Sequence, residues 1–299
     1  MSIITTVAVP LNSFALVTLV YCYKNEGFSL RSALLLSLTC SDIIVSTVGF
    51  SMQILFEDYV SCIAAGYVVS SFSLVSMVHM VVLSLERLLC IKYPFKAAGL
   101  FVKKRVVALF VAICWLYGLT WGTLFPLLGW GGYIYESVEA HRCSIDIIST
   151  DVTTEAYIYC LLFCCYVVPV TGTLCCFLII RNELKKMAKN ASMLQGRDSK
   201  SAQNTVKQER ALAVIAFMML ACFLSTWTPY AFCVFYRRTG GVITPAAFHA
   251  CAYMGKTATI WNPIIYIFAY RTFRRTVVKM MPCLKKNRII NITSVNDTS

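Results

Sequence analysis

The residue with the most distinctive chemistry is Lys256, near the middle of the apolar stretch 246–268. This stretch is long enough for a membrane-spanning helix, which needs about 20 apolar residues. A lysine at the centre of such a helix costs roughly 2.5 to 3.5 kcal/mol on insertion scales. Its amine must therefore be paired with a carboxylate or chemically modified, and a buried primary amine is the group that condenses with an aldehyde to form a Schiff base.

Seven apolar runs, separated by polar turns, surround this lysine, and each is long enough for one membrane span. They cover residues 3–23, 30–56, 63–90, 106–128, 156–180, 210–236 and 246–268. Only 14% of the residues are charged, against about a quarter in soluble domains. We therefore predict an all-α fold, a seven-transmembrane helix bundle. The first run leads into a charged turn without a cleavage pattern, so we expect it to be a span and not a cleavable leader.

The basic residues predict the orientation of the bundle. Most of the 27 Lys and Arg residues fall in the loops that follow spans one, three, five and seven, whereas the other loops contain Arg142, Arg237 and Arg238. Because basic residues concentrate on the cytoplasmic side, the amino end is expected outside. The net charge of +13 then follows from topology and gives no reason to expect nucleic acid as a partner.

The loops contain two further signals. Most of the 15 Cys residues lie inside apolar runs, where a thiol behaves as a small hydrophobe. Cys62 and Cys143 fall in outer loops or at their edges, and we predict a disulfide between them that holds the long outer loop as a lid. The polar segment 187–206 has no helical periodicity and predicts a mobile inner linker between spans five and six.

The chain is divided into three regions in this interpretation: a seven-span domain over 1–268, an amphipathic inner-face helix over 269–283, and a flexible cytoplasmic tail over 284–299. Phe273 and Val277 alternate with Arg274 and Arg275, as in a helix that lies on membrane lipids. Cys283 follows and is a candidate for palmitoylation.

Several motifs along nearly the whole chain resemble the rhodopsin-like class of G-protein-coupled receptors. The matching residues are Asn12, Asp42, Cys62, Glu86-Arg87, Trp115, Pro169, Trp227-Thr228-Pro229 and Asn262-Pro263-Ile264-Ile265-Tyr266. Lys256 stands six residues before Asn262, the spacing at which opsins attach retinal. The resemblance is therefore to opsins, and it implies that Lys256 binds retinal, 11-cis or all-trans, through a Schiff base.

The residues around Lys256 are expected to hold the chromophore. Trp227 and Tyr230 are one turn apart in span six, and Tyr253 is one turn outward of Lys256 in span seven. Aromatic rings at these positions are suited to bracket a flat polyene. Without the lysine, Trp227 is equally well explained as a packing residue at the proline of span six.

A protonated Schiff base in an apolar pocket requires an anion. The segments 43–56, 63–85 and 246–268 contain no Asp or Glu, so we expect the counterion in an outer loop. Glu136 follows the Gly129-Trp130 pair, which resembles the loop that supplies the counterion in many invertebrate-type opsins. A solvated loop acid is the alternative role for Glu136. The other candidate counterions are Glu139, Glu57 and Asp58.

The resemblance also implies a gate on the inner face. Arg87, beside Glu86, is expected to face Glu209 at the inner end of span six, although a solvated ion pair would give the same pattern. Separation of these groups would open a groove for a heterotrimeric G protein. Asn262, Pro263 and Tyr266 complete this gate in the family motif.

Other inner positions bear on signalling. Phe177 stands where the family usually has a tyrosine that stabilises the open state, so we expect a weakened active state. Hydroxyl residues at 293, 294, 298 and 299 are candidate sites for a receptor kinase before arrestin binding.

Three functions remain to be weighed. The leading hypothesis is a light-sensing receptor, not an enzyme, in a plasma or photoreceptor membrane, which activates a G protein. The alternative is a retinal photoisomerase of the opsin family without signalling, which would have no need of a gated inner face. A receptor for a diffusible ligand would leave Lys256 unexplained, and Val69 stands where amine receptors have Asp.

Overall fold

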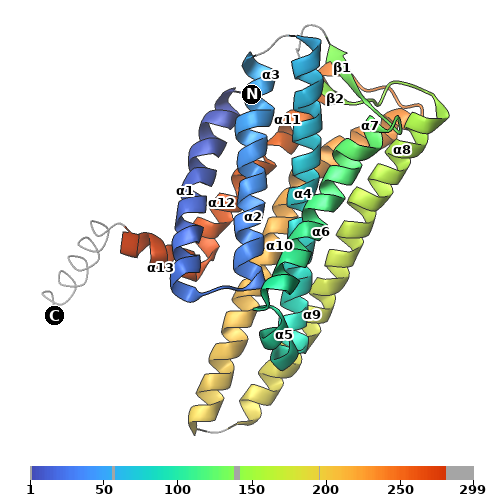
Figure 1. Ribbon diagram of the computed structural model, residues 1–299. Helices are drawn as coiled ribbons and strands as arrows, with labels where there is room; N and C mark the ends of the chain where they lie inside the picture. Colours follow the sequence, from blue (N-terminus) through green and yellow to red (C-terminus); the bar gives the residue numbers. More distant parts are fainter. Residues whose placement is uncertain (1, 56–57, 138–141, 195, 281–299) are drawn as a thin grey trace, which may run out of the picture.

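The computed structural model describes residues 2–55, 58–137, 142–194 and 196–280 of the 299-residue chain. The α-helices are α1 (Ser2–Glu26), α2 (Leu30–Ile44), α3 (Phe50–Leu55), α4 (Tyr59–Lys92), α5 (Pro94–Leu100), α6 (Lys104–Leu119), α7 (Phe125–Leu127), α8 (Val152–Leu162), α9 (Val168–Met193), α10 (Gly196–Arg238), α11 (Pro245–Lys256), α12 (Ala258–Ala269) and α13 (Arg271–Met280). Wide π-helical turns, η1 (Val45–Gly49), η2 (Thr120–Leu124) and η3 (Phe163–Val167), continue α2, α6 and α8. The strands β1 (Tyr133–Ser137) and β2 (Arg142–Ile145) form a hairpin at one end of the bundle, which we call the hairpin end (Figure 1).

The elements combine into seven rods, which confirms the predicted seven-helix bundle. Six of these rods, searched over the described residues, are long and apolar enough to cross a membrane. The seventh rod is divided at Thr257 into α11 and α12, of 12 residues each, so neither half has the length of a span. The chain is an integral membrane protein.

Two of the wide turns are explained by prolines that follow in the chain. Proline has no amide hydrogen, so Pro126 leaves the carbonyl of Gly122 in η2 without its usual helical donor. The hydroxyl of Tyr133, on β1, donates to this carbonyl at 2.7 Å. Pro169 stands in the same relation to Cys165 in η3. The irregularity in the fourth rod therefore provides an attachment point for the hairpin.

The hairpin covers the end of the bundle as the sequence predicts. Its strands pair antiparallel, with Tyr135 opposite Cys143. Cys143 forms the predicted disulfide with Cys62 at the start of α4, and their Cα atoms are 5.4 Å apart. After β2, Arg238 at the end of α10 donates to the carbonyl of Ser149 at 2.7 Å. The lid is thus held at both ends.

The prediction of a mobile linker between spans five and six is wrong for most of the segment 187–206. Helix α9 continues to Met193, and α10 begins at Gly196. The segment is rich in Lys, Ala, Met and Gln, which favour helix. Both extensions project beyond the rest of the bundle (Figure 1). A helix surrounded by solvent needs no apolar stripe, so the absence of periodicity was a poor guide here.

Helix α13 turns away from the bundle at the end opposite the hairpin (Figure 1). The side chains of Phe273 and Thr276 are buried, and the Phe273 ring lies 6.2 Å from that of Phe14 in α1. The helix is therefore held by apolar packing against the first rod. The palmitoylation candidate Cys283 and the predicted tail 284–299 lie outside the described residues.

Candidate functional site

A large apolar cavity lies within the bundle beneath the hairpin. Its empty volume is about 1120 Å³, counting the space at its open side, which is enough for a small organic ligand. The walls come from α3, α4, α8, η3, α10 and α11, and β2 closes one side. The lining residues include Gln53, Val69, Ser70, Ser73, Leu74, Met77, Ser144, Ile145, Ile147, Leu161, Leu162, Tyr166, Phe223, Trp227, Tyr230, Ala252 and Lys256.

Lys256 is the last residue of α11 and extends into this cavity. Lys256 is only 8% exposed to solvent. The amine donates a hydrogen bond of 2.9 Å to the side-chain oxygen of Gln53 in α3. It also lies 5.6 Å from the ring centre of Tyr253. The fold thus places a primary amine, screened from water, at a cavity whose other walls are mainly apolar.

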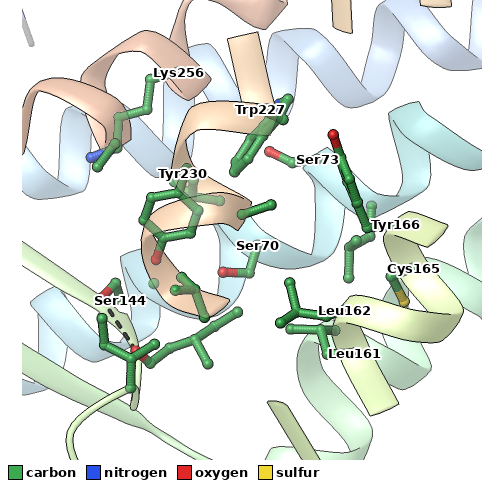
Figure 2. Close-up of a pocket in the computed structure, with 18 of the residues that line it drawn as sticks. Ser70, Ser73, Ser144, Leu161, Leu162, Cys165, Tyr166, Trp227, Tyr230 and Lys256 are labelled. Atoms are coloured by element: carbon green, nitrogen blue, oxygen red, sulfur yellow. Dashed lines mark hydrogen bonds between the residues drawn. The ribbon is translucent and has the colours of Figure 1, made fainter. Parts of the chain in front are cut away.

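The aromatic residues predicted from span six lie between the two sides of the cavity. Figure 2 shows Lys256 entering from one side, Tyr166 and Cys165 at the other, and Trp227 and Tyr230 between them. The Trp227 and Tyr230 rings are 6.0 Å apart and nearly perpendicular. This arrangement fits a long, flat, apolar molecule with an aldehyde at the lysine end.

Close packing holds Trp227 against span seven. A Cβ atom added at Gly255, next to Lys256, would lie 3.3 Å from the indole ring, which is tighter than most such contacts. Tyr253 is 37% exposed and is not among the residues that line the cavity in the described part of the chain. Of the three predicted aromatic contacts, the fold brings Trp227 and Tyr230 into the cavity and keeps Tyr253 beside the amine.

The candidate counterions lie on or near the lid. Glu136 belongs to β1, but its side chain lies outside the described residues, as do Glu57 and Glu139. Asp58 is exposed and caps α4, with its carboxylate accepting from the Ser61 amide at 2.9 Å. These hydrogen bonds from Ser61 hold the pKa of Asp58 below its ordinary value. Its carboxylate therefore already has a structural role.

A polar cluster separates the cavity from the opposite end of the bundle. The Asp42 carboxylate accepts from Asn262 and from Ser76, both at 2.8 Å. These three residues line a smaller cavity that also includes Trp227 and Lys256. A displacement of Lys256 can therefore reach the Asn262-Pro263 segment through side chains that line the same cavity.

Three of the predicted gate residues, Glu86, Arg87 and Glu209, meet at the end opposite the hairpin. Arg87 is buried and its guanidinium pairs closely with Glu86. A second guanidinium nitrogen lies 3.4 Å from the Glu209 carboxylate on α10. Arg31 is a partner that the sequence interpretation missed, 3.6 Å from Glu86. Tyr266 and Arg87 both line a cavity of about 370 Å³ next to this cluster.

Comparison with known proteins assigns the family. Residues 13–266 match the model of the 7 transmembrane receptor (rhodopsin family). The chain belongs to this family of receptors. Its fold matches the crystal structure of squid rhodopsin with a TM-score of 0.82 and 24% identity, over 94% of this chain and 79% of the squid chain.

Within this family the chain is of the opsin type. It is 28% identical to melanopsin-B of Xenopus laevis over 88% of this chain and 51% of the relative. It is 26% identical to rhodopsin of Enteroctopus dofleini over 80% of this chain and 53% of the relative. With melanopsin of Podarcis siculus the identity is 30%, over 76% and 49%. The chain thus spans about half the length of the curated relatives it matches.

Several residues of the site were not found from sequence. Gln53, Ser70, Ser73 and Tyr166 all line the cavity. A buried glutamine in an otherwise apolar span is a signal that was available for Gln53, because a buried amide needs a partner. The serines and Tyr166 carry no comparable signal.

Proposed function

We propose that this chain is a light-sensing receptor that binds retinal covalently at Lys256 and activates a heterotrimeric G protein at the end opposite the hairpin. The observation that carries the proposal is the amine of Lys256, buried at one side of an apolar cavity. The opsin-type similarity of the whole bundle supports the same assignment.

The cavity residues favour Schiff-base formation with an aldehyde. Condensation joins the Lys256 nitrogen to the aldehyde carbon and releases the carbonyl oxygen as water. Retinal supplies a conjugated chain that changes geometry when it absorbs light. Trp227, Tyr230 and the other residues that line the cavity would hold that polyene, and the lid would exclude water.

The link to signalling is span six. Trp227 contacts the cavity, and Pro229 lies inside the same helix, where it weakens the backbone ladder. At the far end of α10, Glu209 faces Arg87. A change of packing at Trp227 is therefore transmitted along one rod to the ion pair, whose separation would expose a groove for a G-protein helix.

The proposal is tested with the purified full chain and added retinal. We expect an absorption band with either the 11-cis or the all-trans isomer, and loss of this band with hydroxylamine. Lys256→Ala should abolish the band, whereas Tyr253→Phe should retain it. A band of unchanged strength in Lys256→Ala would refute covalent attachment at this residue.

The signalling part needs a second measurement. Light should accelerate nucleotide exchange on a heterotrimeric G protein in the presence of the pigment. Light-dependent isomer turnover without exchange would instead support a photoisomerase. The pairing of Arg87 with Glu209 favours the receptor, because an isomerase has no use for a gate at that end.

The counterion is tested separately. We expect Glu136→Gln to move the absorption band toward the ultraviolet at neutral pH, because loss of a carboxylate disfavours the protonated Schiff base. Glu139→Gln, Glu57→Gln and Asp58→Asn serve as comparisons. An unchanged spectrum in Glu136→Gln would exclude Glu136 as the counterion.

Phosphorylation of the tail by a receptor kinase, followed by arrestin binding, is also part of the proposal. Light-dependent phosphorylation tests the kinase step.

A further inference from the structure

The amine of Lys256 has a neutral partner inside the membrane-spanning bundle. Gln53 is 9% exposed and Lys256 is 8% exposed. The side-chain oxygen of Gln53 accepts from the Lys256 amine at 2.9 Å, and both residues line the large cavity. The two side chains come from the second and seventh rods, so this bond connects elements that are 203 residues apart in sequence.

The irregular second rod presents Gln53 to the amine. Asp42 precedes η1, and Gln53 follows it in α3. The hydroxyl groups of Ser46 and Thr47 donate to the carbonyls of Asp42 and Ile43, both at 2.7 Å. Such bonds satisfy carbonyls of a helix at a bend. A wide turn changes which face the following residues present, so η1 sets the direction of Gln53.

A carboxamide has a property that a carboxylate lacks. It contains an acceptor oxygen and a donor NH₂ group, whereas an ionised carboxylate only accepts. A protonated Schiff base donates a hydrogen and a neutral imine nitrogen accepts one. Gln53 can therefore bond with either form by turning its amide group, while a carboxylate at the same position would favour the protonated form.

We propose that Gln53 is the hydrogen-bonding partner of the Lys256 nitrogen in the pigment and sets the balance between its protonated, visible-absorbing form and its neutral, ultraviolet-absorbing form. This inference rests on the proposed function. It concerns the group in contact with the nitrogen and holds whichever acid balances the charge.

Other titratable groups face Lys256 and must be considered in the same titration. Those that line its two cavities in the described part of the chain are Asp42, Cys165, Tyr166 and Tyr230. Tyr253 approaches from the lysine's own helix. The Asp42 carboxylate is already engaged by Asn262 and Ser76, and the side chain of Glu136 lies outside the described residues.

The experiment is a spectral titration of the purified pigment with retinal, which measures the pH at which half of the visible band is lost. Gln53→Glu should move this midpoint upward by roughly 1 to 3 pH units, because it brings an opposite charge to the nitrogen. Gln53→Met keeps the length of the side chain but accepts no comparable bond. It should lower the midpoint, because the bond lost from the protonated nitrogen is charge-assisted and stronger than the bond lost from the neutral one. Gln203→Met, at an exposed glutamine of α10 that lines neither cavity, should leave the midpoint unchanged.

The outcomes separate this inference from the proposed function. If wild-type protein gives no hydroxylamine-sensitive band, the proposed function fails. If it does, and both Gln53→Glu and Gln53→Met keep the wild-type midpoint, the role of Gln53 is overturned. Should Gln53→Glu not fold, Gln53→Asn, whose shorter amide withdraws from the nitrogen, must shift the midpoint in the direction of Gln53→Met. An unchanged midpoint in Gln53→Asn and Gln53→Met would overturn the inference equally.

Discussion

The hydrogen bond between Tyr133 and Gly122 tests how the lid is attached to the bundle. Tyr133 is 7% exposed, and its hydroxyl donates to the Gly122 carbonyl at 2.7 Å. Because Pro126 provides no amide hydrogen, the usual main-chain donor cannot replace the tyrosine hydroxyl at this carbonyl when the hydroxyl is removed. The change Tyr133→Phe therefore leaves a buried acceptor without its present partner.

The size of the expected destabilisation follows from the free-energy cost of a buried polar group without a hydrogen-bond partner. Leaving such a carbonyl without a donor costs about 1 to 3 kcal/mol. We expect Tyr133→Phe to lower the free energy of unfolding by this amount. The measurement is unfolding of the purified protein in mixed micelles as the denaturing detergent is increased, followed by circular dichroism.

A double-mutant cycle makes the reasoning specific. Pro126→Ala restores an amide hydrogen that can bond with the Gly122 carbonyl, so Tyr133→Phe should cost less in that background. Tyr67→Phe is a matched control, since Tyr67 packs on Tyr133 with ring centres 4.3 Å apart. Equal costs of Tyr133→Phe with and without Pro126 would refute the idea that the proline creates the attachment point.

Three further predictions concern the gate, the fifth rod and the lid. Glu209→Gln removes the charge of a partner of Arg87 that is 25% exposed and lies at 3.4 Å. This pair is worth at most about 1 kcal/mol, so nucleotide exchange in the dark should rise by up to roughly 5-fold, whereas Glu183→Gln, in a pair with the exposed Lys186, should not change it. Phe177→Tyr should prolong the signalling state, measured as the decay of exchange activity after a flash; an unchanged lifetime would contradict this role. Asp146 is buried, which raises the pKa of its carboxylate, but hydrogen bonds from Ser149 and Ile148 outweigh burial and hold this pKa below its ordinary value of 3.8. Its stabilising contribution is therefore present above about pH 4 and lost as the pH falls further, so Asp146→Asn should lower stability by about 1 kcal/mol at neutral pH, with a smaller difference near pH 3. A difference that grows on acidification would contradict that sign.

The sequence alone was sufficient for the elements with a strong physical signal. Seven apolar runs predicted the bundle because backbone groups in hydrocarbon must be satisfied within a helix. Cys62 and Cys143 were the Cys residues at outer loops, and the structure confirms their pairing. Lys256 was recognisable because a charge inside an apolar span requires an explanation.

The tertiary structure decided the features that depend on neighbours distant in sequence. The pairing of Gln53 with Lys256 depends on how η1 turns the second rod, and hydropathy contains no information on a wide turn. The helical extension of α9 and α10 was missed because a helix in water needs no apolar periodicity. Composition thus determined which segments cross the membrane. The rotation of each helix about its own axis decided which side chains meet in the cavity, and this rotation is set by prolines, wide turns and contacts between rods.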